Sequence, residues 1–347
     1  MHTKHSATCH ETTAPFLSGN IEDRAIRPAT PDDCPGLVRL FRRTYGDTSH
    51  PCLDDGFIRA GIEDGSHRWF VLDTPEGIGA CACLARHAWN RSREACFGVV
   101  LPELRHLGIV TRLARHCLDC MPQDPAELGY FSMRHPVALH AMRKLIDSVL
   151  VGHDGGPNTV DGVREYHMTA VHPPAAGRFI HVTPAQRAML HWDFLRDAVY
   201  APLGLAIRPG PYPEDCLVGT EHEQETDGFR YTFDARIGAL TLGGYTGAAP
   251  KENGLADDLE RFLATHGKAD YVCARILADK HQLTRRMLAM GFAITAYLPA
   301  WYWREGARFD ALMLVRRRFD DSPQANGFEE EIATMDQAFA QLAARLV

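Results

Sequence analysis

The sequence lacks the long apolar segments that a membrane protein needs. Its 347 residues contain no stretch of about eighteen consecutive apolar residues, so we expect no transmembrane helix. The first ten residues, Met1 to His10, are polar and lack the apolar centre of a secretory signal peptide. We therefore expect a cytoplasmic protein with no membrane partner.

An excess of basic charge is also missing. The chain carries 37 Lys and Arg residues against 44 Asp and Glu residues, and its formal net charge is -7. Proteins that bind mainly to nucleic acid usually present a basic surface, so this balance argues against such a partner. The 10 cysteines, in a long chain without an export signal, favour reduced thiols over disulfides.

The length favours two domains, and changes of composition suggest where they meet. Each half follows the same order of strands, helix, strand, helix and paired strands, with helices expected over 109–120, 137–150, 255–264 and 282–290. A further helix is expected over 184–200. We predict a disordered tail over 1–22, an N-terminal domain over 23–175, a connecting helix within 176–206, a second domain over 207–318 and a C-terminal helix within 319–347.

One strand-loop-helix segment has the residues that a pyrophosphate requires. The strand ends at Pro102, a short loop holds Arg105 and Gly108, and an apolar-periodic helix follows. The first N–H groups of a helix have no partners within the helix, and the helix dipole favours an anion there. Glycine lets the backbone approach a phosphate closely, and Arg105 adds positive charge. A plain structural turn can also use such residues.

This segment resembles the coenzyme A loop of the GNAT acetyltransferases. That loop reads Gln/Arg-x-x-Gly-x-Gly/Ala between a strand and a helix, and Arg105, Gly108 and Val110 occupy its three places. Val110 departs from the family, which prefers Gly or Ala. The resemblance implies that acetyl-CoA, the acyl donor, is bound by a strand and this loop. The residues it assigns are Val99, Val100, Arg105, His106, Leu107, Gly108, Ile109, Val110 and Thr111.

The resemblance extends over most of residues 24–318 and implies an α/β fold. It implies two GNAT-like domains, each a mixed, mostly antiparallel sheet flanked by helices, as in bacterial proteins of the tandem type. In the second half, Met290-Gly291-Phe292 is similar to the start of the family's C-terminal strands. No pyrophosphate loop is visible there, because Asn253-Gly254 lacks a basic partner. The second domain is therefore expected to be degenerate.

The reaction that the resemblance implies is direct attack of an amine on the acetyl-CoA thioester. Glu94, Tyr45 and His135 are candidate catalytic residues, the amine's proton going to a general base. Each also has a structural interpretation: a solvated strand end, a buried aromatic ring and a helix-start residue. Many family members use a Tyr as the acid, but Met142 and Met287 stand in the equivalent places. Strand N–H groups near Val99 and Val100 are expected to stabilise the oxyanion.

We therefore expect an N-acetyltransferase that acts on an amine of a small molecule. The alternatives are a protein acetyltransferase for lysine or N-termini, and a catalytically inactive acyl-CoA sensor or scaffold. Cys81 with Cys83, and Cys117 with Cys120, share faces of their elements, but buried apolar cysteines explain them better than a metal site does.

The C-terminal segment carries an apolar seam at helical spacing. Acidic residues open the segment, which suits the start of a helix. A helix of this length is marginal in water, so its seam must be covered, either by its own chain or in a homodimer. Docking on its own chain is the preferred interpretation. The seam consists of Phe328, Ile332, Met335, Phe339, Leu342 and Leu346.

Overall fold

The structure is a computed structural model. It describes residues 24–46, 50–121, 127–145, 149–160, 163–172, 179–184, 194–219, 224–247, 252–318 and 324–346. The predicted tail over 1–22 lies outside these residues. Among the described helices, none is both long and apolar enough to cross a membrane.

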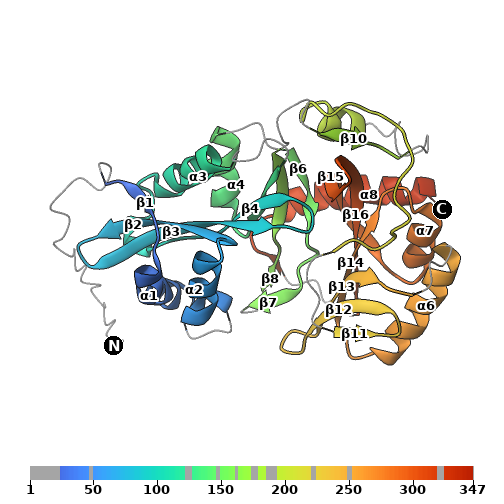
Figure 1. Cartoon of the computed structure of the whole chain (residues 1–347), viewed down its shortest axis with the longest axis horizontal. Coiled ribbons are helices and arrows are strands. Elements are labelled where there is room, and N and C mark those ends of the chain that lie inside the picture. The colour runs from blue at the N-terminus through green and yellow to red at the C-terminus, as the bar shows by residue number, and fades with distance from the viewer. Residues whose placement is uncertain are drawn as a thin grey trace, which may run out of the picture.

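The first half of the chain supplies one end of a large sheet and the helices on its two faces (Figure 1). Its strands are β1 (Ile26–Pro28), β2 (His67–Thr74), β3 (Gly77–His87), β4 (Ser92–Val100), β5 (Leu128–Met133), β6 (Val149–His153) and β9 (Met168–His172). Its helices are α1 (Cys34–Tyr45), α2 (Asp55–Glu63), α3 (Ile109–Cys120) and α4 (Pro136–Leu145). A hairpin of β7 (Asn158–Val160) and β8 (Val163–Glu165) projects from it, and β8 pairs with β17 (Gln324–Ala325).

The second half supplies the other end of the same sheet. Its strands are β10 (Ile180–Val182), β11 (Gln224–Thr226), β12 (Phe229–Asp234), β13 (Ala239–Tyr245), β14 (Tyr271–Leu277), β15 (Ala293–Arg304) and β16 (Ala307–Arg317). Its helices are α6 (Glu252–Thr265), α7 (His281–Ala289) and α8 (Glu329–Leu346). The main order of the sheet is β1-β2-β3-β4-β5-β9-β6-β15-β16-β14-β13-β12-β11, and β10 pairs with β16.

The strand order of the first half recurs in the second, read from the opposite edge. In each half a parallel pair, β4 with β5 or β13 with β14, is followed by a hairpin whose last strand inserts beside the pair. The sheet is mixed and mostly antiparallel, which confirms the predicted α/β class. One sheet runs through both halves, so the division into two domains stays a prediction.

The halves meet where β6 pairs with β15 at Gly152 and Ala296. A Cβ atom on Gly152 would come within 2.3 Å of the Ala296 Cβ atom and of the Thr295 carbonyl oxygen. Only glycine allows these two backbones to approach so closely. The junction therefore depends on that residue.

Each half has its own apolar core. In the first half, helices α1 and α2 cover one face of the sheet and α3 and α4 the other (Figure 1). Leu37, Phe41, Trp69, Leu113 and Met142 are among the buried side chains of this core. A second core is built on β12 to β16 under α6, α7 and α8.

Helix α8 joins the two cores, and it confirms the predicted seam. All six seam side chains are buried, none exposing more than 9% of its surface. Phe328 and Ile332 belong to the core of the first half, whereas Met335, Phe339 and Leu342 belong to that of the second. The helix docks on its own chain, as the preferred interpretation predicts.

A buried polar cluster lies on β16 next to this junction. The Asp310 carboxylate is fully buried and accepts hydrogen bonds from Tyr200 (2.6 Å), Tyr297 (2.8 Å) and the Ala300 N–H (2.8 Å), and His181 Nε2 lies 2.6 Å from it. Burial lowers the pKa of His181, but the charge and hydrogen bond of Asp310 outweigh it and the pKa is raised. The cluster thus holds β10, β15 and β16 together through one carboxylate.

Two predicted helices are wrong in part. The helix predicted over 137–150 ends at Leu145, and β6 begins at Val149, because the apolar run there serves the sheet rather than a helix. In the helix predicted over 184–200, Phe194–Tyr200 is a π-helix, and residues 185–193 lie outside the described residues. The predicted connecting segment also contains β10, which adds to the sheet beside β16.

Candidate functional site

The central strands of the first half, β4 and β5, are paired over only part of their length. β4 and β5 pair in parallel from Ser92 and Leu128 as far as Ala95 and Phe131. β4 then continues to Val100, while β5 ends at Met133 and pairs with β9 on its other side. Among the described residues, no strand pairs with the edge of β4 that faces β5 beyond Ala95. The two strands therefore part and leave backbone available to a ligand.

A bulge in β4 causes this parting. The register between β3 and β4 shifts between Cys81 and Cys83, and Phe97 has a positive φ of 50°. Such a bulge bends the strand and increases its twist. The Phe97 ring is held by Trp69, with ring centroids 5.5 Å apart. A Cβ atom on Gly98 would meet nothing within 4 Å, so the strand is open at this point.

The bulge decides which predicted backbone N–H faces the opening. The N–H of Val99 bonds to Cys81 on β3, and the N–H of Leu101 donates to the Gly79 carbonyl on β3 at 3.0 Å. Alternate N–H groups of a strand point to opposite edges, so that of Val100 faces the gap beside β5. The N–H of Val100 is therefore the one oriented towards a ligand there, while that of Val99 faces β3, and the predicted roles of both residues stay predictions.

The predicted loop lies between this strand and α3. Gly108 directly precedes the helix with a φ of 69°, and His106 has a φ of 68°. Arg105, His106 and Gly108 are exposed, and the Leu107 side chain exposes 37% of its surface. Ile109 is buried and anchors the first turn. The early N–H groups of α3 are thus fixed at an accessible point, which suits an anion.

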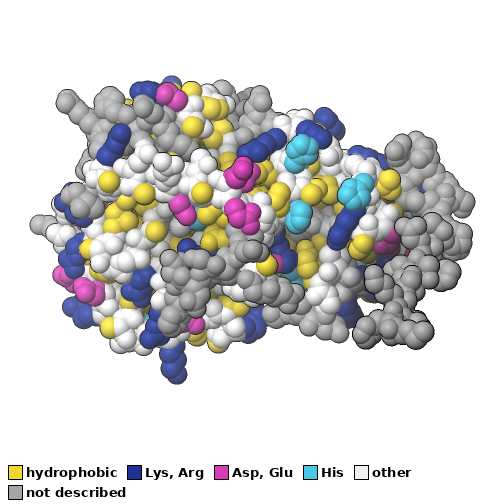
Figure 2. Space-filling model, turned by 180° about the vertical axis from the view of Figure 1, so that it is seen from behind, with side chains coloured by type: hydrophobic (Ala, Val, Ile, Leu, Met, Phe, Trp, Pro, Cys, Tyr) yellow, Lys and Arg dark blue, Asp and Glu magenta, His cyan; other side chains and the backbone are white. Residues whose placement is uncertain are grey.

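Further predicted loop residues lie in the first turn of α3. Val110 and Thr111 are half-buried, and Val110 packs against the core of the first half. The Val110 side chain therefore points at least partly inward, so it crowds the helix start less than the sequence suggests. Histidine and basic side chains lie side by side on one face of this half (Figure 2). In the sequence, the loop, α3 and α4 contain the following basic and histidine residues: Arg105, His106, Arg112, Arg115, His116, His140, Arg143 and Lys144.

Glu94 lies on β4 one residue before the strands part. Its Oε2 atom accepts a hydrogen bond from the Tyr130 hydroxyl at 3.0 Å and lies 3.1 Å from His87 Nε2. Burial raises the pKa of Glu94, but hydrogen bonds from His87, Ser132 and Tyr130 and the charge of His87 outweigh it. The pKa therefore lies below its ordinary value, and the carboxylate is ionised at neutral pH.

Tyr45 ends α1 and forms an aromatic wall with His50. Their rings stack with centroids 5.1 Å apart, and the Arg134 guanidinium lies 5.0 Å from the centre of the Tyr45 ring. Burial raises the pKa of Tyr45. Burial, with the nearby charge of Arg134, lowers the pKa of His50 to about 4. Both rings are therefore neutral near pH 7.

His135 is exposed, and its Nδ1 atom accepts the Val137 N–H at 3.2 Å at the start of α4. Its structural interpretation, a residue bonded to the helix-start backbone, accounts for this contact. Among the described residues, no hydrogen bond or ring contact joins Glu94, Tyr45 and His135. The structure thus gives the three predicted residues separate surroundings.

Sequence reasoning missed the partners of these residues. Tyr130 and His87 hold Glu94, and strand register could have indicated Tyr130, which lies directly opposite Glu94. His167 Nδ1 lies 2.8 Å from Asp154. Burial lowers the pKa of His167, but Asp154 outweighs it, so the pKa is raised. No local sequence signal brings these residues together.

In the second half, the corresponding gap is filled by the chain itself. β13 and β14 pair in parallel from Ala239 and Tyr271 to Leu242 and Ala274, and β14 continues to Leu277. Residues 216–219 then lie beside β14. The Val218 N–H donates to the Arg275 carbonyl at 2.9 Å, and the Leu277 N–H to the Cys216 carbonyl at 3.0 Å. This half therefore offers no comparable free edge on β14.

The residues in the usual place of the family's acid are both in cores. Met142 exposes 3% of its surface and Met287 none. Cys81, Cys83 and Cys117 are also buried. Within the described ranges, no group of three His, Cys, Asp or Glu side chains is arranged to hold a metal ion.

Comparisons with known proteins were made for the whole chain. No protein family matches the sequence, and no curated protein matches it. Solved structures of acetyltransferases resemble part of it. A spermidine N-acetyltransferase mutant (SpeG) from Vibrio cholerae is 16% identical over 43% of this chain and 95% of its own, with a TM-score of 0.36. A phosphinothricin acetyltransferase from Sinorhizobium meliloti, in complex with AcCoA, is 16% identical over 44% and 94%, with a TM-score of 0.38. NAA60 from Arabidopsis thaliana is 14% identical over 43% and 97%, with a TM-score of 0.36.

Proposed function

We propose that the protein is a GNAT-type N-acetyltransferase of the tandem type that binds acetyl-CoA in its first half and acetylates an amine of a small molecule. The observation that carries the proposal is the parting of β4 and β5 directly before the start of α3. Strand backbone in the gap suits the amide-containing arm of the donor, and the helix start beyond it suits a pyrophosphate. The repeated strand order supports two GNAT-like halves.

The residues present fit such a donor. The Val100 N–H faces the gap, and Gly98 leaves open space beside it. Arg105 and the first N–H groups of α3 would hold the pyrophosphate, while the neighbouring histidine and basic side chains favour further phosphate. Residues 216–219 fill the equivalent gap of the second half, which supports one donor site per chain.

The chemistry follows from the groups near the gap. The amine nitrogen attacks the thioester carbonyl carbon, and the Val100 N–H donates to the oxygen that becomes negative. Glu94, which is already ionised, accepts the proton from nitrogen, directly or through water, and His87 offers that proton a path to solvent. The thiolate leaves without a dedicated acid, because the family's Tyr is absent at Met142.

The buried Met142 also favours a rival function, an acyl-CoA sensor or scaffold without catalysis. Release of free thiol from acetyl-CoA in the presence of a panel of amines distinguishes the two. A protein acetyltransferase would instead require peptides as acceptors, so peptides with free lysine or N-terminal amines belong in the same panel.

The first test concerns the donor site. Arg105→Glu places an anion beside the expected pyrophosphate, so acetyl-CoA should bind at least about tenfold more weakly by calorimetry. Arg39→Glu is the matched control, since it reverses an exposed charge on α1, which covers the other face of the sheet (Figure 1). Equal affinities of the wild type and the Arg105 variant would remove the central claim.

The second test concerns Glu94. Glu94→Gln removes the proton acceptor and should lower kcat about a hundredfold, with acetyl-CoA affinity unchanged. Because the pKa of Glu94 is lowered, the carboxylate stays ionised through the neutral range, so its titration should not limit wild-type activity there. Glu127→Gln, a buried ion-paired residue beside the same strands, should retain kcat. Loss of activity in the Glu127 variant alone would contradict the assignment.

A further inference from the structure

Two adjoining cavities lie between the β7–β8 hairpin and the sheet of the second half. Their volumes are about 240 and 280 Å³, and both are lined by Pro157, Ile237 and Tyr271. The inner cavity also reaches Arg275 on β14 and the hydroxyls of Thr232 and Thr241. Its size suits a small molecule rather than a folded partner.

Arg275 is the basic residue of the inner cavity that lacks an ion-pair partner among the described residues. Asp154 is held by His167 at 2.8 Å, and Asp234 by Arg236 at 2.7 Å. Among the described residues, no carboxylate lies within ion-pair distance of the Arg275 guanidinium. Its Nε atom is buried without a hydrogen-bond partner. A buried guanidinium N–H in this state is costly, so Arg275 has unused capacity to bind an anionic group.

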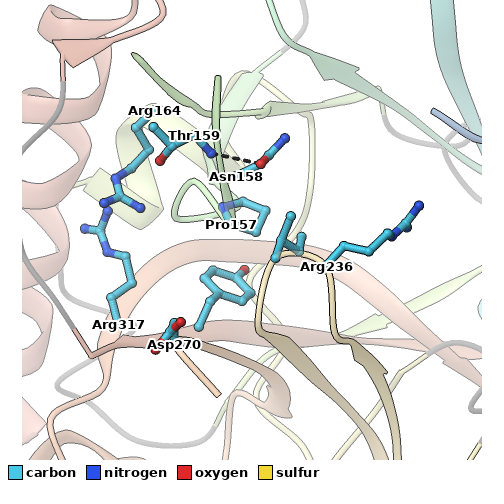
Figure 3. Close-up of a pocket in the computed structure, with 9 residues that line it drawn as sticks. Pro157, Asn158, Thr159, Arg164, Arg236, Asp270 and Arg317 are labelled. Atoms are coloured by element: carbon cyan, nitrogen blue, oxygen red, sulfur yellow. Dashed lines mark hydrogen bonds between the residues drawn. The ribbon is translucent and has the colours of Figure 1, made fainter. Parts of the chain in front are cut away.

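The outer cavity adds the positive charges of Arg164 and Arg317, and Asp270 also lines it. Figure 3 shows the Arg164 and Arg317 guanidinium groups next to each other, whereas Arg236 points away. Arg317 donates a hydrogen bond to the Tyr166 hydroxyl at 3.1 Å. Because that hydroxyl is neutral, the bond does not compensate the positive charge of Arg317. An anion in these adjoining cavities therefore lies near the positive charges of Arg164 and Arg317 as well as that of Arg275.

Strand register connects Arg275 to the opening in the first half. Ser132 lies opposite Thr169, and Thr169 opposite Gly152. Gly152 lies opposite Ala296, Ala296 opposite Met313, and Met313 opposite Arg275. Directly opposed residues share a face of the sheet, so this row crosses from β5 to β14 on one face. Most of its side chains are small.

Charged residues from both halves of the chain, Arg275 and Glu94, act on the hydroxyl group of Tyr130. Burial raises the pKa of Tyr130 well above its ordinary value, and the charge of Arg275 acts in the opposite direction. The Tyr130 hydroxyl also donates to Glu94 at 3.0 Å. Arg275 from the second half and Glu94 from the first are therefore within electrostatic reach of one phenol.

We propose that the acceptor is an amine that also carries a carboxylate, and that Arg275 binds this carboxylate while the amine lies towards Glu94. This inference rests on the proposed function and adds a substrate class to it. A guanidinium fork matches a carboxylate geometrically and is always charged. The second half thus selects the acceptor, and the first half provides the donor and the base.

The test compares pairs of acceptors that differ only in the charge of the carboxyl group. Glycine, lysine and glycylglycine are each assayed beside their C-terminal amides, with acetyl-CoA and the full chain. The wild type should prefer at least one acid over its amide. In Arg275→Gln the ratio of kcat/KM for that acid to kcat/KM for its amide should fall about a hundredfold. In Arg261→Gln, the matched control on the exposed face of α6, the ratio should stay within about twofold.

The outcomes separate this inference from the proposed function. An unchanged ratio in a folded Arg275→Gln protein, with its melting temperature retained, would overturn the role of Arg275. If no amine is acetylated although acetyl-CoA binds, the transferase proposal fails instead. Calorimetry with N-acetylglycylglycine then still tests the site, because its affinity should fall in the Arg275 variant and not in the Arg261 variant. Equal affinity in all three proteins would remove the carboxylate site.

Discussion

Deletion of residues 326–347 should lower the melting temperature by at least about 10 °C. The deletion removes six buried apolar side chains, and full burial of each contributes about 1.5–3 kcal/mol. It opens both cores, because α8 supplies side chains to each. It also removes Asn326, whose amide accepts the Tyr166 N–H at 3.0 Å and donates to the Tyr166 carbonyl at 3.1 Å. Calorimetric melting of the full and shortened chains measures the effect.

A point variant in α8 refines this test. Phe339→Asp places a charge in the second core and should cost about 4 kcal/mol or more of unfolding free energy. Ala340→Asp adds the same charge on the exposed face of the helix and should change stability by no more than about 0.5 kcal/mol. Equal melting temperatures of the shortened and full chains would mean that α8 does not stabilise either core.

Asp310→Ala should lower the unfolding free energy by about 4 kcal/mol. The change leaves the His181 imidazole, two tyrosine hydroxyls and the Ala300 N–H without their buried acceptor. Asp310→Asn, which keeps an acceptor oxygen but no charge, should fall between the wild type and the alanine variant. Urea unfolding measures all three proteins. Asp215→Ala is the control, since its ion pair with Arg304 is exposed and contributes about 1 kcal/mol or less.

The same cluster makes stability depend on pH. Because the pKa of His181 is raised in the folded protein, its contribution is fully present below the ordinary histidine value of 6.5. It is lost as pH rises through the raised value. Unfolding free energies measured from about pH 5 to about pH 9 should therefore show this decline in the wild type and not in Asp310→Ala. A decline of equal size in both proteins would assign it to another group.

Local patterns were sufficient for some elements of the fold. The seam of α8 follows directly from apolar spacing, and the loop at Arg105 and Gly108 follows from a strand, glycine and helix in sequence. The boundary between α4 and β6 could not be predicted in this way. The short apolar run near Val149 fits a helix or a strand, and the sheet decides between them.

The site depends more on contacts between distant residues. The bulge at Phe97 decides that Val100, not Val99, faces the gap, and a bulge has no period that reveals it. The pairing of Glu94 with His87 and Tyr130 requires the register of three strands. Arg275 reaches the same face through five further pairings across both halves. Such residues become visible only when the sheet is known.

The position of α8 in the chain has a consequence for synthesis. Every other described helix and strand leaves the ribosome before it, yet Phe328 and Ile332 are needed to close the core of the first half. Domains made early usually fold as units while translation continues. Here neither half can complete its interior until α8 has emerged, so chains that stop before α8 expose apolar surface. We expect ribosome-bound chains that stop before Phe328 to recruit chaperones and to be sensitive to protease.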